Sequence, residues 1–526
     1  MVRTDSDGVK CEYPSQGTWT FGDIVLSSEF CSGNIGHVEA VDDEQTCFEL
    51  RTSPDCAGQP FETNYRTWFY FSVSGAKKDQ TLTFTVMNMN PQTKMFNQGM
   101  KPVYRLGSSA WDKWERIKDE VTYSCGEGRQ FQIRFKFRFS SDSTVFFAFS
   151  YPYSFEDVKR KLDAIQDAVA SKLGAKTSES AIYLERETLT YSLEGRRMEV
   201  LTITDYFGAS SEREEEIENL FPEGKQRPLV FPEKKYFVLS ARVHPGESPA
   251  QWMWDGAIDF LVNKEDPRAK ALRRAFVFKV VPIINPDGVA RGHYRADTQG
   301  LNLNRFYDAP DRTRHPTVWA IKELVVWLKG RTNLKFFVDL HAHATKRGCF
   351  CYANALPTYQ EMIDNMMYAR MIAINSAHFD FGSCVFSEKA MESKDRNGQS
   401  KEGSSRVGIY RATGLVHSMT PPAATQDPRA SPGETWRGPL PKFNTSIFRD
   451  VGKALMVAAL DMEELNPWSR VPNSHSKSMA ETREWLGKGG RTLQEVSTRN
   501  NERTRRGRRW PWRRQKSHEA PVPVRM

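Results

Sequence analysis

Strand-like apolar runs alternate with helical segments between residues 180 and 465, and this alternation constrains the fold more than any other feature. Runs rich in Val, Ile and Phe cover Lys234–Val243, Arg273–Asn285 and Leu334–Leu340, and amphipathic helical patterns cover Pro249–Val262 and Pro316–Lys329. This order predicts an α/β domain around a largely parallel or mixed central sheet flanked by helices. Ligands of such sheets bind beyond the carboxyl ends of the strands, so polar motifs at those ends are the first candidates for a functional site.

The regions on either side of this domain have different patterns. Residues 1–153 contain short segments that alternate apolar and polar side chains, such as Thr81–Val86, and they predict an antiparallel β-sandwich. From residue 468 onward the chain is polar, rich in Arg and without periodicity, so we expect this part to be disordered. We therefore divide the chain into a β-sandwich domain (1–153), an α/β domain (154–467) and a disordered basic tail (468–526).

Three properties of the whole chain bear on where the protein works. The first eight residues contain no apolar stretch of the kind found in signal peptides. No run of about 18 uncharged apolar residues occurs, so we expect no membrane partner. The 8 cysteines are scattered without a CxxC pair, which suits a reducing compartment. These properties predict a soluble protein of the cytoplasm, with the nucleus as a second candidate location.

Two histidines and one glutamate follow the apolar runs. His244 and Glu247 lie three residues apart directly after one run, and His341 lies near the end of another. Two imidazoles and one carboxylate form the ligand set of an open zinc site, in which the fourth position is left for water or substrate. The Pro-Gly pair between the first two ligands predicts a tight turn that lets both side chains reach one ion. We therefore predict one Zn²⁺ per chain, with Asp339 or His343 as candidates to orient a ligand.

Further motifs lie between these candidate ligands and raise the specificity of the prediction. They are Asn285-Pro-Asp-Gly288, Gly292-His-Tyr-Arg295 and Gly300-Leu-Asn-Leu-Asn-Arg305. Together with His244–Glu247 and Asp339–His343, and in this order, they resemble the cytosolic carboxypeptidases, a branch of the zinc metallocarboxypeptidases. The resemblance covers roughly residues 15 to 470.

Other segments extend the same resemblance beyond the catalytic motifs. Phe30–Asn34 and Tyr151–Tyr153 are similar to parts of the small β-rich domain that precedes the catalytic domain in that family. Three segments resemble the fifth vertebrate-type subgroup, namely Asp266–Arg268, Asp461–Met462 and Asn466–Trp468. The family resemblance therefore implies a β-rich N-terminal domain and a zinc-carboxypeptidase α/β domain.

The resemblance also implies an activity and assigns residues to it. It implies removal of C-terminal or branch-point glutamates from polyglutamylated proteins, so glutamylated tubulin tails or other acidic protein C-termini are the expected partners. By motif position, it implies that the zinc ligands are His244, Glu247 and His341. Arg295, Asn304 and Arg305 match residues that hold the terminal carboxylate of the substrate and polarise the scissile carbonyl, and Arg406 is a candidate to meet an acidic substrate side chain.

One part of this apparatus is missing from the sequence. Peptide hydrolysis on zinc needs a carboxylate that takes a proton from water and passes it to the leaving amine. In the family this glutamate lies in a stretch of the form His-Ser-Tyr-Thr-Leu-Glu, whereas this chain has His417-Ser-Met-Thr-Pro-Pro422. Pro422 therefore occupies the glutamate position. Because two adjacent prolines lack the N–H groups of a strand ladder, we also expect a disrupted strand here.

Three explanations for the missing base remain open. A splice variant or a faulty gene model has lost the segment with the glutamate, or the protein is a catalytically silent zinc protein that recognises glutamylated microtubules, or a displaced residue such as Glu434 or Glu402 serves as the base. From the sequence we expect a chain that binds one zinc but turns over little substrate. We also expect that Pro422→Glu alone does not restore activity, because the strand is disrupted as well.

The positive charge of the chain is concentrated near its C-terminal end. The formal net charge is +9, and residues 497–516 contain nine Arg or Lys and one Glu, so the rest of the chain has a net charge of 9 − 8 = +1. This segment has three interpretations: a solvated end, a patch that attracts acidic tubulin tails, or a nuclear-localisation or nucleic-acid patch with stacking tryptophans. The nucleic-acid interpretation is the weakest, and we do not expect nucleic acid to be the main partner.

Overall fold

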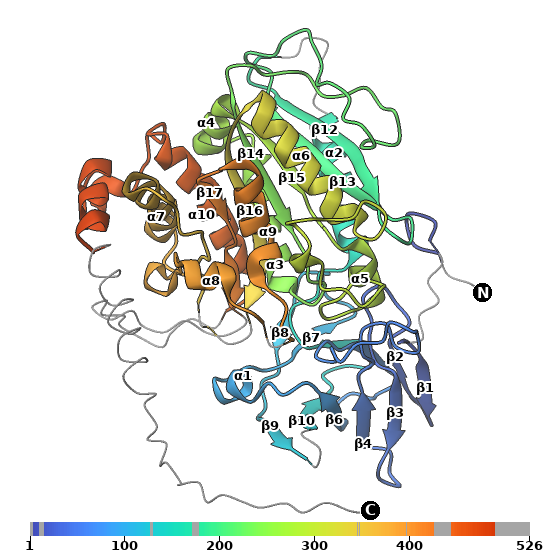
Figure 1. The fold of residues 1–526 in the computed structure, drawn as a ribbon. Coiled ribbons are helices and arrows are strands. Elements are labelled where there is room, and N and C mark those ends of the chain that lie inside the picture. The colour runs from blue at the N-terminus through green and yellow to red at the C-terminus, as the bar shows by residue number, and fades with distance from the viewer. Residues whose placement is uncertain are drawn as a thin grey trace, which may run out of the picture.

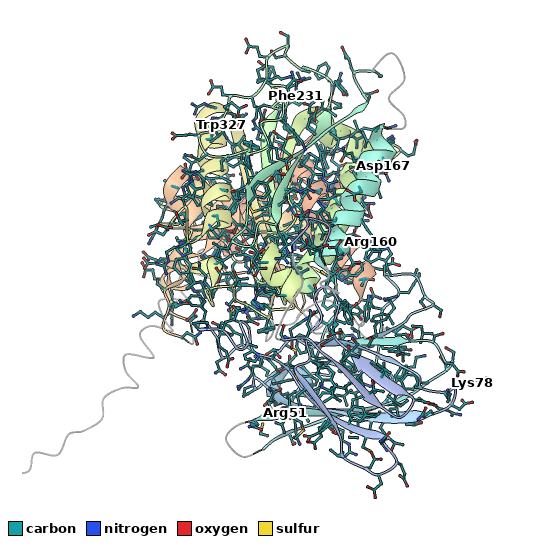
Figure 2. All side chains as sticks on the ribbon, turned by 90° about the vertical axis from the view of Figure 1, so that its right-hand side faces the viewer. Arg51, Lys78, Arg160, Asp167, Phe231 and Trp327 are labelled. Carbon is teal, nitrogen blue, oxygen red and sulfur yellow. The ribbon has the colours of Figure 1, made fainter. Side chains whose placement is uncertain are left out.

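A β-sandwich and a larger α/β body make up the described part of the chain and lie against each other along one side (Figures 1 and 2). The computed structural model describes residues 4–9, 15–126, 130–170, 178–343, 346, 348–395, 397–424 and 443–489. Within these ranges, no helix has the length and apolar composition needed to cross a membrane. The basic segment 497–516 lies outside the described residues, so the predictions for it are not tested.

Two sheets form the sandwich. The first contains β1 (Thr18–Phe21), β2 (Ile24–Ser27), β5 (Tyr70–Ser74), β11 (Val145–Ala148), β7 (Val103–Leu106) and β8 (Glu115–Arg116), in this spatial order. The second contains β3 (His37–Ala40), β4 (Cys47–Arg51), β6 (Thr81–Met89), β10 (Phe131–Arg138) and β9 (Val121–Cys125). Along β10, apolar residues are buried at every second position and polar residues face outward, as the sequence pattern predicted. A short helix, α1 (Thr93–Asn97), follows β6.

The α/β body is built on one mixed sheet. Its spatial order is β12 (Ile182–Tyr191), β13 (Arg197–Asp205), β15 (Phe276–Val281), β14 (Lys235–Ala241), β16 (Asn333–His343) and β17 (His417–Met419), and β18 (Pro422–Ala424) also pairs with β16. Strand β13 runs antiparallel to both of its neighbours, β12 and β15. All other neighbouring pairs in the sheet, from β15 to β17 and β18, are parallel. The predicted mixed sheet is therefore confirmed.

Helices cover both faces of this sheet. They are α2 (Phe155–Ala170), α3 (Ser248–Leu261), α4 (Pro267–Ala275), α5 (Pro286–Arg291), α6 (Pro316–Arg331), α7 (Tyr359–Asn375), α8 (Glu388–Glu392), α9 (Ser405–Thr413) and α10 (Thr445–Met462), with short 3₁₀ turns at Leu303–Arg305, Phe381–Ser383, Lys401–Gly403 and Val471–Asn473. Alternate residues of β14 enter two different apolar clusters. Phe237 and Leu239 join the cluster that includes α3 and α10, and Tyr236 and Val238 join the cluster under α6.

Three sequence predictions need correction. Helix α3 is not amphipathic, because it lies between the sheet and α10 and is buried on nearly every side. Arg273–Ala275 do not begin a strand; they end helix α4, whose first turn is capped by the side chain of Asp266. The chain is also structured beyond residue 468. Residues 479–489 are helical, and Trp485 packs against Phe381 near the end of α7.

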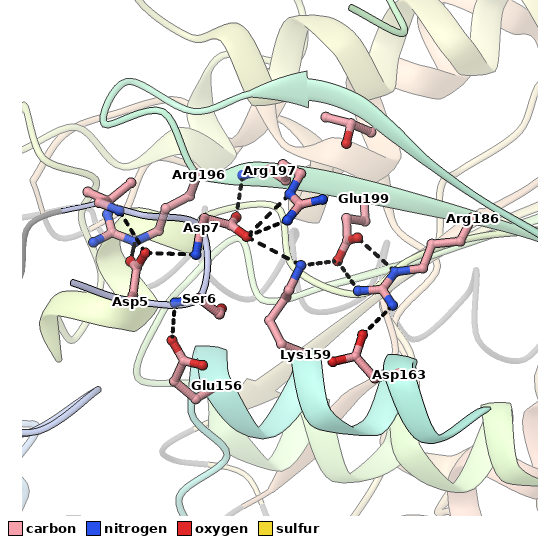
Figure 3. Close-up of polar contacts among 12 residues, drawn as sticks. Asp5, Ser6, Asp7, Glu156, Lys159, Asp163, Arg186, Arg196, Arg197 and Glu199 are labelled. Carbon is pink, nitrogen blue, oxygen red and sulfur yellow. Dashed lines mark hydrogen bonds and ion pairs between the residues drawn. The ribbon is translucent and has the colours of Figure 1, made fainter. Parts of the chain in front are cut away.

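The segment 4–9 lies on the α/β body rather than on the sandwich (Figure 3). Asp5 accepts a hydrogen bond from Nε of Arg196 at 2.7 Å, and the side chain of Arg196 is fully buried. Asp7 forms ion pairs with Lys159 at 3.3 Å and with Arg197 at 3.2 Å. The two aspartates therefore attach the first described residues to α2 and to the start of β13.

Candidate metal centre

The turn between β14 and α3 places His244 and Glu247 on the same side of the sheet edge. Backbone strain is concentrated there, because Arg242 has a left-handed φ of 59°. Gly246 packs so closely on Tyr294 that a Cβ at this position would lie 2.7 Å from the Tyr294 carbonyl oxygen. Helix α3 begins directly after Glu247, so the carboxylate lies near the positive end of the helix dipole. The Pro-Gly turn predicted from the sequence therefore forms.

His341 reaches the same point from β16, the neighbouring strand. Its Nδ1 is 3.0 Å from Oε2 of Glu247, and Nδ1 of His244 is 2.8 Å from Oε1 of the same carboxylate. One ligand atom from each of the three residues lies within 4.8 Å of the others. Within the described residues, these three side chains form a group of His and Glu that could hold a metal ion. The structure thus brings together the three residues that the sequence singled out.

The outer nitrogen of each imidazole has a partner of its own. Nε2 of His341 is 2.9 Å from Oδ2 of Asp339, whose carboxylate also accepts hydrogen bonds from Ser240 and Ser405. Nε2 of His244 is 2.9 Å from Oδ1 of Asn302. Such contacts fix the ring orientation and leave Nδ1 free for an ion.

The sequence analysis named Asp339 and His343 as candidates to orient a ligand. Of these two, Asp339 contacts the outer nitrogen of His341. Nε2 of His343 instead lies 3.3 Å from the hydroxyl of Tyr352, away from His341. Asn302 was missed by sequence reasoning, although its place inside the Gly300–Arg305 motif was a usable signal.

The chemistry of the three side chains fits a cation. Burial, reinforced by the nearby guanidinium of Arg295, lowers the pKa of His244 to about 4, so the ring is neutral at pH 7. Because its Nε2 points at an amide oxygen and therefore carries the proton, Nδ1 presents a lone pair to Glu247 only 2.8 Å away. Two acceptors at this separation repel unless a cation lies between or beside them.

The other two groups support the same conclusion. Burial opposes charge on His341, but the carboxylates of Asp339 and Glu247 outweigh it and raise its pKa to about 10. Burial likewise opposes charge on Glu247, yet the two histidines hold its pKa well below the usual range. The site is therefore built to hold positive charge. Two imidazoles and one carboxylate are a ligand set typical of zinc.

The candidate substrate-binding residues gather beside this centre. Nη1 of Arg295 is 3.7 Å from Oε1 of Glu247, and its side chain is 27% exposed. Arg305 is paired with Asp395 at 2.9 Å, and Asn304 accepts a hydrogen bond from the backbone of Ser405. No sequence motif indicated that a carboxylate of the chain itself would face Arg305.

Arg406 lies deeper in the protein, and within the described ranges it forms no ion pair with a carboxylate. Its guanidinium donates to Oδ1 of Asn354 at 3.0 Å and to the carbonyl of Ala390 at 2.9 Å. Burial lowers its pKa to about 10. Lys401, which the sequence analysis did not single out, donates to the hydroxyl of Ser393 at 3.0 Å. Its pKa is lowered by burial and then by the cations of Arg305 and Arg406, which shows that these groups share one positive region.

Pro422, for which the family resemblance implies a glutamate, lies next to the candidate metal centre. Pro422 pairs with His341 in the parallel register of β18 and β16. Residues that pair in this way point to the same face of a sheet, so a side chain at position 422 faces the side on which His341 meets Glu247. Among the described residues, the carboxylates that hydrogen-bond to His341 are Glu247 and Asp339. The neighbouring strand thus places Pro422 beside His341.

The expected disruption of this strand is only partial. The ladder is interrupted between β17 and β18, but pairing with β16 resumes at Pro422. The prolines are tolerated because they serve as acceptors: the carbonyl of Pro421 accepts from the backbone of His341, and that of Pro422 accepts from Phe350. The predicted disruption is therefore confirmed only for the interruption after Met419, because pairing continues from Pro422 onward.

Of the two candidates for a displaced base, only Glu402 lies within the described residues. Glu402 is held by Arg411 at 2.6 Å and by the hydroxyl of Ser400 at 2.9 Å, and its side chain is 41% exposed. Its carboxylate is thus engaged on the surface. Glu434 lies outside the described residues.

Comparisons with known proteins define the class. Residues 171–414 match the family described as zinc carboxypeptidase, and residues 26–150 match the cytosolic carboxypeptidase N-terminal domain. A metallo-carboxypeptidase from Burkholderia cenocepacia has a similar fold, with a TM-score of 0.61 and 23% identity, over 84% of this chain and 99% of that chain. A metallo-carboxypeptidase from Pseudomonas aeruginosa gives a TM-score of 0.59 and 20% identity, over 84% of this chain and 100% of that chain. By fold and by these family matches, the chain belongs to the zinc carboxypeptidases.

More similar sequences narrow the class to one branch. Cytosolic carboxypeptidase-like protein 5 from Homo sapiens is 35% identical, covering 96% of this chain and 70% of its own length. The protein of the same name from Rattus norvegicus is 35% identical over 91% of this chain and 73% of its own length. Cytosolic carboxypeptidase 6 from Mus musculus is 31% identical over 70% of this chain and 63% of its own length. The chain belongs to the cytosolic carboxypeptidases.

Proposed function

We propose that this chain binds one zinc ion and recognises the glutamate chains of polyglutamylated proteins such as tubulin, and that it hydrolyses them slowly because Pro422 occupies the position of the general base. The observation that carries the proposal is the convergence of His244, Glu247 and His341, with the outer nitrogen of each imidazole already held. When bound there, zinc would lower the pKa of its water and polarise a carbonyl.

The charge around the centre supports an acidic substrate. Among the residues that the structure describes, Arg295 forms an ion pair only with Glu247, and neither Lys401 nor Arg406 forms one with an acidic side chain. Such cations repel one another, and a substrate with several carboxylates relieves that repulsion. A guanidinium also matches a carboxylate through paired hydrogen bonds. A polyglutamate chain end supplies a terminal carboxylate and side-chain carboxylates together, so tubulin tails or other acidic C-termini are the proposed partners.

The slow turnover is proposed from the residue at position 422. Without a base, the chain's own residues can bind and orient the substrate, but none in the neighbouring strand can move a proton from water to the leaving amine. The alignment with the human relative covers 631 positions, more than the 526 residues of this whole chain, so that relative contains segments that this chain lacks.

A catalytically silent recogniser of glutamylated microtubules is the second candidate. It is favoured by the same pair of features, an intact ligand set beside a base position that holds proline. The transcript that encodes residues 419–441 distinguishes the two, because a skipped exon there restores the interpretation as an enzyme. The cytoplasm is the proposed location, in keeping with the family to which the chain belongs.

The test uses the purified full chain with zinc. Metal content is measured, and peptides that end in a glutamate chain are compared with matched peptides that end in glutamine, by calorimetry for binding and by release of free glutamate for turnover. We expect about one zinc per chain, binding that is selective for glutamate, and little release. Absence of zinc binding contradicts the proposed site. Rapid release from the chain as written would contradict the loss of the base and indicate a displaced one.

A further inference from the structure

A carboxylate of the sandwich domain is buried against the backbone of the α/β body. Oδ1 of Asp55 accepts a hydrogen bond from the N–H of Tyr294 at 2.6 Å, and Oδ2 accepts from Arg295 at 2.7 Å and Ala296 at 2.8 Å. Asp55 is fully buried. Consecutive N–H groups that converge in this way form a concave site for an anion, which here is filled by a residue more than 200 positions earlier in the chain.

The same loop of the sandwich makes further contacts with this segment. The backbone N–H of Cys56 donates to Nε2 of His293 at 3.3 Å, and Sγ of Cys56 lies 3.2 Å from the carbonyl of Asp297. A Cβ at Gly300 would lie 2.4 Å from the carbonyl oxygen of Phe61. Figure 1 shows α5, which leads into the segment, at the boundary with the sandwich. Residues 293–300 are therefore shaped by the sandwich.

This segment connects Asp55 with the metal centre in two ways. The side chain of Arg295 extends toward Glu247, with Nη1 at 3.7 Å from Oε1. The carbonyl of Tyr294 accepts a hydrogen bond from the N–H of Gly246 at 2.8 Å, directly before Glu247. Asp55 thus binds the backbone N–H groups of residues 294–296. The side chain of Arg295 and the carbonyl of Tyr294, in the same segment, contact Glu247 and the turn before it.

We propose that Asp55 is a positioning residue of the catalytic centre: it fixes the backbone of residues 294–296 so that the Arg295 guanidinium meets the carbonyl of the glutamate-chain substrate. The inference rests on the proposed function for the identity of the substrate. It gives the sandwich a part in substrate polarisation, in addition to its packing on the α/β body. Geometry of this kind matters because a displacement of about 1 Å in a catalytic group can lower a rate by roughly 100-fold.

The test compares two ligands of the zinc-loaded full chain. One is diglutamate, and the other is its phosphinate analogue, in which a tetrahedral phosphorus replaces the scissile carbonyl. Neither measurement requires the general base. The variant is Asp55→Asn, which keeps the shape but replaces one acceptor oxygen by an NH₂ group that faces a backbone N–H. The matched control is Ser32→Ala, because Oγ of Ser32 donates to the carbonyl of Val289 at 2.6 Å across the same boundary but away from residues 294–296.

We expect Asp55→Asn to weaken phosphinate binding about 10- to 100-fold while diglutamate affinity changes much less and zinc content does not change. In an Arg295→Ala background, Asp55→Asn is expected to weaken phosphinate binding no further, because the two residues act as one unit. Ser32→Ala is expected to leave the affinity ratio of the two ligands unchanged. Hydrogen exchange of the amides of residues 294–296 is expected to accelerate in Asp55→Asn.

Several outcomes overturn the inference. Equal weakening of both ligands, unchanged affinities, or the same loss in the Arg295→Ala background would show that Asp55 only stabilises the fold. If Asp55→Asn does not fold, hydrogen exchange in the unaltered chain decides, since amides 294–296 that exchange faster than those of β14 contradict a fixed segment. Failure of the unaltered, zinc-loaded chain to bind either ligand overturns the proposed function as well, whereas failures confined to Asp55→Asn overturn this inference alone.

Discussion

The two strands that border the metal centre differ in what they contribute. Strand β16 supplies His341, whose two ring nitrogens are both within 3.0 Å of carboxylate oxygens. Strand β18, paired with it in register, supplies Pro422 opposite that histidine, without any side-chain group that can accept a proton. One strand therefore carries a polar side chain of the candidate metal centre, and its neighbour places an apolar ring beside it.

The arrangement of the three candidate ligands does not depend on the residue at position 422. These ligands are stabilised by their own partners, because Asp339 is held by Ser240 and Ser405 and Asn302 holds His244. None of these contacts involves β18. We therefore expect substitutions in β16 and in β18 to have different effects.

Removal of a ligand from β16 is expected to have the largest effect. His341→Ala should abolish zinc binding, with a loss of affinity greater than the roughly 10- to 100-fold that is typical of losing an outer partner. Metal content after dialysis against a weak chelator measures it. The matched control is His343→Ala, two residues further along the same strand, whose ring contacts Tyr352 instead. Equal zinc loss in both variants would mean that the ligand set is assigned wrongly.

Restoring a base on β18 is expected to have the next largest effect. Because position 422 faces the same side of the sheet as His341, Pro422→Glu should raise glutamate release by up to about 10²- to 10⁴-fold, the usual contribution of a general base. This expectation replaces the one made from the sequence, which assumed that the strand is lost. Pro422→Gln, which cannot accept the proton, is the control. No gain in either variant would indicate that residues missing from the chain are needed as well.

Loss of an outer partner should affect zinc without affecting β18. Asn302→Ala is expected to weaken zinc binding about 10- to 100-fold, because the ring of His244 loses the contact that fixes its orientation. Competition with a fluorescent zinc chelator measures this change. Asn304→Ala serves as the control, since Asn304 bonds to the backbone of Ser405 and not to a ligand. An unchanged zinc affinity in Asn302→Ala would show that His244 does not need this partner.

The smallest expected effect is the pH dependence of folding stability that arises from His417 on β17. Burial lowers the pKa of His417 to about 4, below the value of about 6.5 in an unfolded chain. The unfolded chain therefore takes up this proton first, so stability is full above about pH 6.5 and falls as the pH drops toward 4. We expect a loss of roughly 1–2 kcal/mol, reduced because the residue is partly exposed.

Urea unfolding at pH 7 and pH 4.5 measures this effect, with His417→Gln as the control that removes the titrating ring. The ring of His417 stacks on Phe336, with centroids 4.7 Å apart. The same pH dependence in both proteins would assign the effect to other groups.

The local parts of the fold and site could be predicted, and the distant parts could not. The end of β14, the turn after it and the start of α3 are encoded within a dozen neighbouring residues, so the pair His244 and Glu247 was visible in the sequence. Helix α4 was missed because Arg273–Ala275 precede an apolar run without a turn residue. The burial of α3 on nearly every side depends on α10, which lies almost 200 residues later, and periodicity cannot report such a neighbour.

The same rule separates the predicted from the missed residues of the site. Arg295 and Arg305 belong to recognisable motifs, whereas Asp55 and Asp395 act through contacts with segments far away in the sequence. Strand β18 shows the opposite error. Two prolines argued against pairing, but their carbonyl oxygens are what the neighbouring residues use.

The attachment of residues 4–9 has a consequence for synthesis on the ribosome. Asp5 finds Arg196 after a separation of 191 residues, so its partner is made only once the whole sandwich and α2 have emerged. At about 5–20 residues per second, that delay is on the order of 10–40 s. During that interval α2 can already offer Lys159 to Asp7, whereas the contact of Asp5 with Arg196 cannot form until β13 begins to be made.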